Sequence, residues 1–91
     1  MPRPHIPAPP RRRGTGRPPK RSDLTTAIVL VAVRHYGTHA HFALTLMGWP
    51  GKVVSAALLR EIDAGHLDCG FSTDRCWLTM SGLRRLEGGR R

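Results

Sequence analysis

One division in composition governs what this chain can fold into. Residues 1–21 contain seven of the eight prolines and seven cations, but no acidic residue, and Ile6 is their only large apolar side chain apart from Met1. Such a segment cannot bury enough apolar surface to offset the entropy of ordering it. We therefore expect a disordered basic Pro/Arg-rich arm over residues 1–21 and one folded domain over residues 22–91.

The folded part is small and only weakly charged. A domain of this length buries about 60% of the surface of its unfolded chain, which suffices for a simple fold without a deep substrate cavity. The whole chain has a net charge of +9, but because the arm takes seven cations, residues 22–91 keep a net charge of only +2. The arm is therefore the main electrostatic feature of the chain.

Composition also predicts the compartment. The longest apolar run, residues 27–33, is far too short to cross a bilayer, and the Pro-rich start does not resemble a signal peptide. We expect a cytoplasmic protein, associated with the nucleoid in a bacterium or nuclear in a eukaryote, with no membrane partner. Cys69 and Cys76 make no disulfide framework and lack the close Cys or His companions of a zinc site, so they are expected to be reduced.

The first helix is expected over residues 24–36. Ser22 is a suitable N-cap, Leu24 begins the apolar run, and Tyr36 precedes a helix-stopping Gly37. The β-branched centre is also compatible with a buried strand. As a helix it is apolar on nearly every side, so it needs a second cover, and a homodimer through this helix would supply one.

Two further helices follow. Thr38 is expected to cap a short helix over residues 39–47, with Phe42, Ala43 and Leu46 on one packed side. After an interruption at residues 48–51, a third helix is expected from about Pro50 to Ala64, ended by Gly65. Its buried stripe is predicted at every fourth residue, namely Val54, Leu58 and Ile62.

Beyond Gly65 the pattern changes to a period of two and predicts a β-hairpin with residues 73–74 at its tip. In this register Phe71 opposes Cys76 and Cys69 opposes Leu78, which puts the two cysteines diagonally on one inward face. Thr79 or Ser81 is expected to cap a last helical turn, with Leu83 and Leu86 pointing inward.

This order of elements, mainly α with a small β-hairpin, resembles a winged helix-turn-helix. Residues 38–67 are similar to the family's capped helix, glycine-containing turn and helix ending in glycine and an apolar residue. Residues 75–82 with Leu86 are similar to its second wing strand and closing helix. The resemblance implies binding to double-stranded DNA, with the third helix in the major groove and the hairpin beside the backbone. Within this arrangement, position and side-chain chemistry make four residues of the domain candidate DNA contacts, Lys52, Ser55, Arg60 and, at the hairpin tip, Arg75.

The arm carries a second resemblance. Residues 11–21, with the Gly-Arg-Pro core at 16–18, look like an AT-hook, although Thr15 stands where that family usually has a second arginine. An extended Gly-Arg-Pro segment suits the narrow minor groove of A·T tracts, and a generic polyelectrolyte arm is the alternative. Under either interpretation the DNA-binding cations of the arm are Arg11, Arg12, Arg13, Arg17, Lys20 and Arg21.

Other chemistries find little support in the sequence. His35, His39 and His41 do not share one helical face, so we expect no metal site, and no nucleophile has an evident base and orienting partner, so we expect no enzyme activity, cofactor or small-molecule ligand. The preferred hypothesis is a sequence-specific DNA-binding regulator of bacterial or phage type. The alternatives are a winged-helix protein-interaction module and an architectural, replication or packaging DNA-binding protein.

Overall fold

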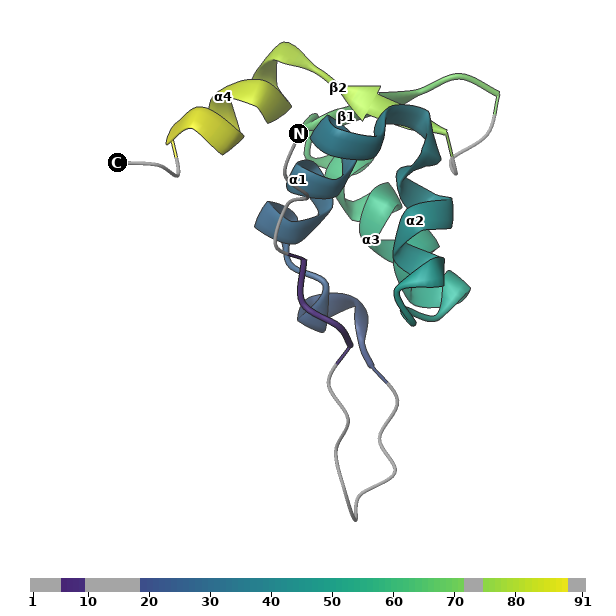
Figure 1. The fold of residues 1–91 in the computed structure, drawn as a ribbon. Helices are drawn as coiled ribbons and strands as arrows, with labels where there is room; N and C mark the ends of the chain where they lie inside the picture. Colours follow the sequence, from purple (N-terminus) through teal and green to yellow (C-terminus); the bar gives the residue numbers. More distant parts are fainter. Residues whose placement is uncertain (1–5, 10–18, 72–74, 89–91) are drawn as a thin grey trace.

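The computed structural model describes residues 6–9, 19–71 and 75–88, and it confirms a mainly helical chain with a two-stranded antiparallel hairpin (Figure 1). The four α-helices of the described part are α1 (Thr26–Tyr36), α2 (Ala40–Leu46), α3 (Gly51–Asp63) and α4 (Met80–Gly88). Two 3-10 turns, η1 (Arg21–Asp23) and η2 (Gly37–His39), precede α1 and α2. The strands β1 (Leu67–Cys69) and β2 (Cys76–Leu78) separate α3 from α4.

The predicted start of the first helix is wrong by two residues. Ser22 lies inside η1, where the Asp23 carboxylate accepts a hydrogen bond from the Lys20 backbone N–H at 2.8 Å. Leu24 then leaves helical geometry, with φ −91° and ψ 85°, and buries its side chain completely. Thr25 is therefore the N-cap of α1, and its hydroxyl accepts from the backbone N–H of Ile28 at 3.4 Å. The predicted end is confirmed, because Gly37 adopts a positive φ of 61° that only glycine adopts without strain.

Helix α2 exists, but the structure reverses the face that was expected to pack. Ala40 and Leu44 are buried, whereas Phe42 and Leu46 are 64% and 71% exposed. Thr38 is not a cap, because it lies in η2 and no side chain caps α2. Ala40 and Leu44 lie about one helical turn apart on the side of α2 that meets the core, and Phe42 and Leu46 lie on the side that does not.

Helix α3 matches its predicted span to within one residue at each end. Pro50 lies just before its first residue, and Val54 and Leu58 are buried as expected. Ile62 is only partly buried, while Ala57 and Glu61 lie on the buried face. The core-facing stripe of α3 thus ends on a carboxylate.

The hairpin is confirmed, but its predicted register is wrong by two residues. Leu67 pairs with Leu78, Asp68 with Trp77, and Cys69 with Cys76. Phe71, which was expected to face inward, is fully exposed beyond the end of β1. The connection between the strands is therefore longer than a tight turn, and the expected tip at residues 73–74 lies outside the described residues.

Thr79, one of the two predicted caps, is the N-cap of α4. The Thr79 hydroxyl accepts a hydrogen bond from the Gly82 backbone N–H at 3.1 Å. A Cβ atom at Gly82 would clash with the backbone oxygen of His66. Only glycine therefore allows α4 to approach the start of the hairpin this closely. Leu83 and Leu86 are partly buried, and Leu86 packs against the core.

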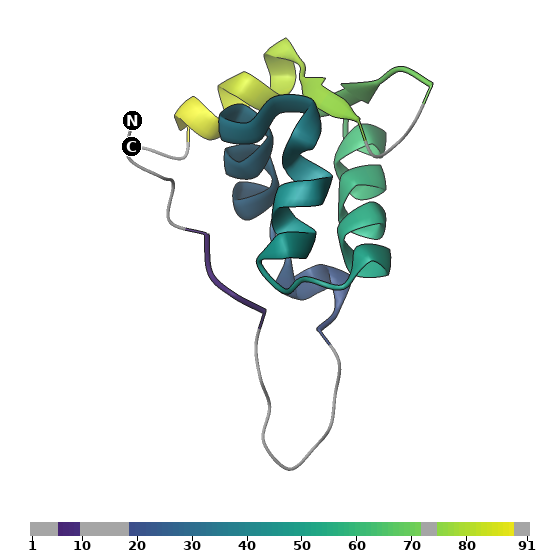
Figure 2. The same cartoon turned by 45° about the vertical axis from the view of Figure 1, so that its right-hand side comes forward.

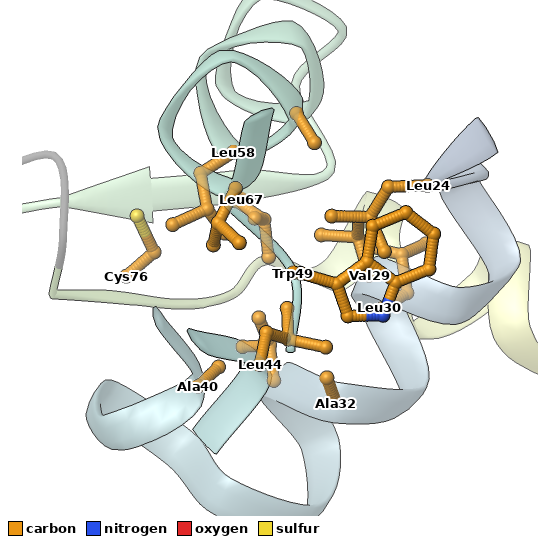
Figure 3. Packing of buried hydrophobic residues seen from close by; sticks show 13 residues of the cluster. Leu24, Val29, Leu30, Ala32, Ala40, Leu44, Trp49, Leu58, Leu67 and Cys76 are labelled. Atoms are coloured by element: carbon orange, nitrogen blue, oxygen red, sulfur yellow. The ribbon is translucent and has the colours of Figure 1, made fainter. Parts of the chain in front are cut away.

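The core lies between α1, α2, α3 and the hairpin, with Trp49 among leucine and valine side chains of α1 and α2 (Figure 3). Helix α1 contacts η2, α2, α3, β2 and α4, and Val29, Leu30, Ala32 and Val33 are buried within the single chain. The proposed reason for a homodimer, an uncovered apolar α1, is thus removed by the chain's own elements.

Part of the predicted arm packs against the domain. Ile6 is partly buried against the core, and the indole N–H of Trp49 donates to the Pro7 carbonyl at 3.1 Å. Pro9 also lies close to Gly48, in the turn between α2 and α3. The expectation that all of residues 1–21 stay unpacked is therefore wrong for residues 6–9, because Ile6 packs against the core and the Pro7 carbonyl accepts a hydrogen bond from Trp49.

Candidate nucleic-acid interface

Helix α3 keeps one side open, which a helix that inserts into a groove requires. Its buried side is formed by Val54, Ala57, Leu58 and Glu61. On the opposite side Lys52, Leu59 and Asp63 are exposed. Helices α2 and α3 stand side by side, and the hairpin continues from the far end of α3 (Figure 2).

Two predicted contact residues of α3 lie on or beside this open side. Lys52 is exposed in the first turn of α3. Ser55 is partly buried, and its hydroxyl lies 3.1 Å from Nε2 of His41 on α2. Ser55 thus joins α2 to α3 at the edge of the open side, and its contact with a base stays a prediction.

Arg60 does not belong to this surface. Its Nε donates to the Glu61 carboxylate at 2.6 Å, and its two terminal nitrogens donate to the backbone carbonyls of Arg21 and Leu24 at 3.0 and 2.7 Å. The guanidinium nitrogens are thus occupied by hydrogen bonds within the domain. These bonds hold α3 against the segment before α1. Arg60 is therefore not available as the DNA contact that was predicted, and it positions α3 against the segment before α1.

Glu61 is the polar centre that sequence reasoning missed. Its side chain is 1% exposed and accepts hydrogen bonds from Thr26 at 2.8 Å, Arg60 at 2.6 Å and His66 at 2.8 Å. Burial by itself raises the pKa of Glu61, but the hydrogen bonds from His66, Arg60 and Thr26 and the charge of Arg60 together lower the pKa below its ordinary value. The carboxylate thus joins the first turn of α1, the end of α3 and the residue before β1.

The sequence contained a signal for this cluster. Glu61 follows Val54 by seven residues and Leu58 by three, which is the spacing of one helical face. An acid in such a stripe, with an arginine beside it and a histidine five residues later, indicates a buried charge that has partners.

The hairpin supplies one further predicted residue. Arg75 is exposed immediately before β2. Trp77, on the outward face of β2 opposite Asp68, is 45% exposed. Arg75 thus lies where the hairpin's loop meets its second strand and not at the expected tip, and its contact with a phosphate stays a prediction.

The cationic segment of the arm, residues 10–21, is flanked at both ends by residues that lie beside α3. Its first anchor is Pro9 at Gly48, two residues before Pro50. Its second anchor is η1, where Lys20 and Arg21 are exposed and the Arg21 carbonyl accepts from Arg60 of α3. The remaining cations predicted for the arm, Arg11, Arg12, Arg13 and Arg17, lie outside the described residues.

Comparisons of the chain with protein-family models, curated proteins and solved structures found no match. In the described ranges no three His, Cys, Asp or Glu side chains gather as metal ligands would. Nor does any helix in those ranges have the length and hydropathy that a membrane span requires.

Proposed function

We propose that this chain binds double-stranded DNA through a winged helix-turn-helix in which α3 enters the major groove. The order of elements supports this proposal, because three helices are followed by a hairpin and a closing helix. The open side of α3 supports it as well, with Lys52 at the end that follows the α2–α3 turn. Arg75 on the hairpin then lies on the element expected to follow the phosphate backbone.

The observation that carries the proposal is the anchoring of the cationic segment at both ends of α3. Arg11 follows Pro9 by two residues in the sequence. Pro9 itself lies at Gly48, in the turn from which α3 starts. The largest concentration of positive charge in the chain is therefore attached beside the helix that would contact bases, and not at a distant terminus.

In this arrangement two parts of the chain contribute differently to DNA binding. Four arginines between the anchors neutralise phosphates on any sequence, and each phosphate contact adds about 0.9 to the slope of log affinity against log salt. Lys52 and Ser55 are the groups on α3 that can distinguish base edges or set the register on the duplex. Affinity should therefore depend mainly on the segment between the anchors, and sequence preference mainly on α3.

The test begins with selection of bound duplexes from a random pool by the full chain. Fluorescence anisotropy then compares a selected duplex with a random duplex of equal length, over a range of salt concentrations. Replacing Arg11, Arg12, Arg13 and Arg17 with glutamine should lower the salt slope by as much as roughly 3.6 on both duplexes. Lys52→Ala should lower the affinity for the selected duplex by about fivefold or more if it contacts a base.

The matched control is Arg84→Ala, which removes one exposed cation from α4, away from the proposed interface. It should change binding by less than about twofold. The proposal is refuted if no sequence is enriched by selection, or if Lys52→Ala and Arg84→Ala have equal effects on the selected duplex.

A second candidate function, docking of another protein, is favoured by the exposed apolar side chains of α2. Phe42 and Leu46 lie one helical turn apart and are 64% and 71% exposed. The variant Phe42→Ser with Leu46→Ser distinguishes the two functions. It should leave DNA affinity unchanged if α2 serves a protein partner, whereas Lys52→Ala should leave that partner's binding unchanged.

A further inference from the structure

Cys69 and Cys76 occupy directly opposed positions in the hairpin. Cys69 is the last residue of β1, Cys76 is the first residue of β2, and the two are register partners. Both are present as thiols in the structure. Six residues, 70–75, connect them along the chain.

The hydrogen-bond pattern of the hairpin brings these two side chains close together. The backbone N–H of Thr79 donates to the His66 carbonyl at 3.1 Å, which marks residues 66 and 79 as a hydrogen-bonded pair. Because such pairs alternate along an antiparallel ladder, residues 69 and 76, three positions further, form a non-hydrogen-bonded pair. The Cα atoms of such pairs are about 4.5 Å apart, which lies within the range that a disulfide spans.

The two thiols differ in access to solvent. Cys76 is only 2% exposed, whereas Cys69 is partly exposed at the end of β1. A dissolved oxidant therefore meets Cys69 first, and Cys76 is positioned to attack the sulfur of Cys69 from the neighbouring strand. This is the arrangement of an attacking thiol with a resolving thiol.

We propose that Cys69 and Cys76 form a thiol–disulfide site whose co-substrate is a small disulfide of the glutathione type. The Cys69 thiolate attacks one sulfur of glutathione disulfide, a mixed disulfide forms, and one glutathione thiolate leaves. The Cys76 thiolate then attacks the Cys69 sulfur and displaces the second glutathione. The two protein thiols lose two electrons and two protons, and one glutathione disulfide becomes two glutathione thiols.

The product is a covalent link between β1 and β2 at the base of the hairpin loop. It closes a covalent ring around the six residues, 70–75, that connect the two strands. This site is independent of DNA binding, since its formation depends only on the hairpin register.

The experiment equilibrates the full chain with mixtures of reduced and oxidised glutathione, in native buffer and in concentrated urea. Acid-quenched samples are then analysed by mass spectrometry, thiol titration and non-reducing electrophoresis. In native buffer we expect a monomer that has lost two hydrogen atoms and both titratable thiols. The equilibrium constant for oxidation should be at least about tenfold larger in native buffer than in urea, because the folded hairpin holds the sulfurs together.

Thermodynamic linkage requires the oxidised chain to be more stable than the reduced chain by the same factor, and tenfold corresponds to about 1.4 kcal/mol. The matched control is Cys69→Ala with Phe71→Cys, which keeps two thiols but moves one to an exposed position beyond β1. For this control the native and urea constants should be equal within about threefold. A mixed disulfide as the end product, a disulfide-linked dimer, or a native constant no larger than that in urea would overturn the proposal.

Discussion

The carboxylate of Glu61 offers the sharpest test of what holds α3 against α1. In the variant Glu61→Ala, the donors on Thr26, Arg60 and His66 all lose their common acceptor. Removing one partner of a buried ion pair costs about 3–5 kcal/mol, because the remaining charge stays buried without compensation. The lower end of this range of free energies applies to Glu61→Ala, since the Arg60 side chain is 25% exposed and retains two backbone carbonyl acceptors.

A loss of about 3 kcal/mol is a large share of the stability of so small a domain. It corresponds to a fall in Tm of roughly 12–24 °C, at about 4–8 °C per kcal/mol. The isosteric variant Glu61→Gln keeps the shape and one acceptor oxygen but loses the charge. We expect it to cost about 1–2 kcal/mol, the difference between charge-assisted and neutral hydrogen bonds.

The assay is urea unfolding followed by far-UV circular dichroism. Combining Glu61→Ala with Arg60→Ala gives a double-mutant cycle, and residues in one network should show a coupling energy above about 1 kcal/mol. If Glu61→Ala lowers the free energy of unfolding by less than about 1 kcal/mol, or if the two substitutions are additive, the carboxylate does not hold the two helices together.

Three further expectations follow from the same contacts. Because the folded-state pKa of Glu61 is lowered, its contribution is complete above the unfolded pKa of about 4.3 and is lost as pH falls through the folded pKa. The stability difference between the native chain and Glu61→Gln should therefore shrink below about pH 4, and urea unfolding from pH 7 to pH 3 would contradict this if the difference stayed constant. Gly82→Ala should cost about 2–3 kcal/mol of unfolding free energy, since its Cβ would clash with the His66 backbone oxygen. Ser81→Ala is the control, and equal unfolding midpoints for the two variants would argue against the close approach. Deleting residues 1–9 in a Trp77→Phe background should shift Trp49 emission to the red, because Trp49 loses the Pro7 carbonyl and the cover of Ile6; an unchanged spectrum would show that this segment does not pack there.

Local signals in the sequence predicted the elements whose boundaries depend on local chemistry. The positive φ of Gly37, the hydroxyl cap of Thr79 and the Pro-Gly start of α3 each act within a few residues, and the structure confirms all three elements. The alternation after Gly65 likewise predicted the hairpin. Each of these features is determined by residues of the same short segment, so the sequence of that segment is enough to predict it.

The errors occurred where distant contacts decide between local alternatives. In α2 either Ala40 with Leu44 or Phe42 with Leu46 can form the buried face, and packing against α1 and α3 selects Ala40 and Leu44. The hairpin register depends on the length of its connection, and a tight turn and a longer loop are both compatible with the alternating residues. A shift of two residues keeps the same side chains inward, so hydrophobicity alone does not detect it.

The reassignment of Arg60 changes what can be expected of α3. Arg60 and Lys52 are the two cations of this helix, and Arg60 joins Glu61 and the carbonyls of Arg21 and Leu24 in holding the fold together. The open side of α3 therefore presents one positive charge, Lys52, and one negative charge, Asp63. A helix with so little net charge cannot hold a polyanion by itself at moderate salt. If the chain binds DNA, the cations anchored beside α3 must supply most of the affinity, and α3 must act mainly by discriminating among sequences already bound. Affinity and sequence preference then become separable properties of two segments that meet at Gly48.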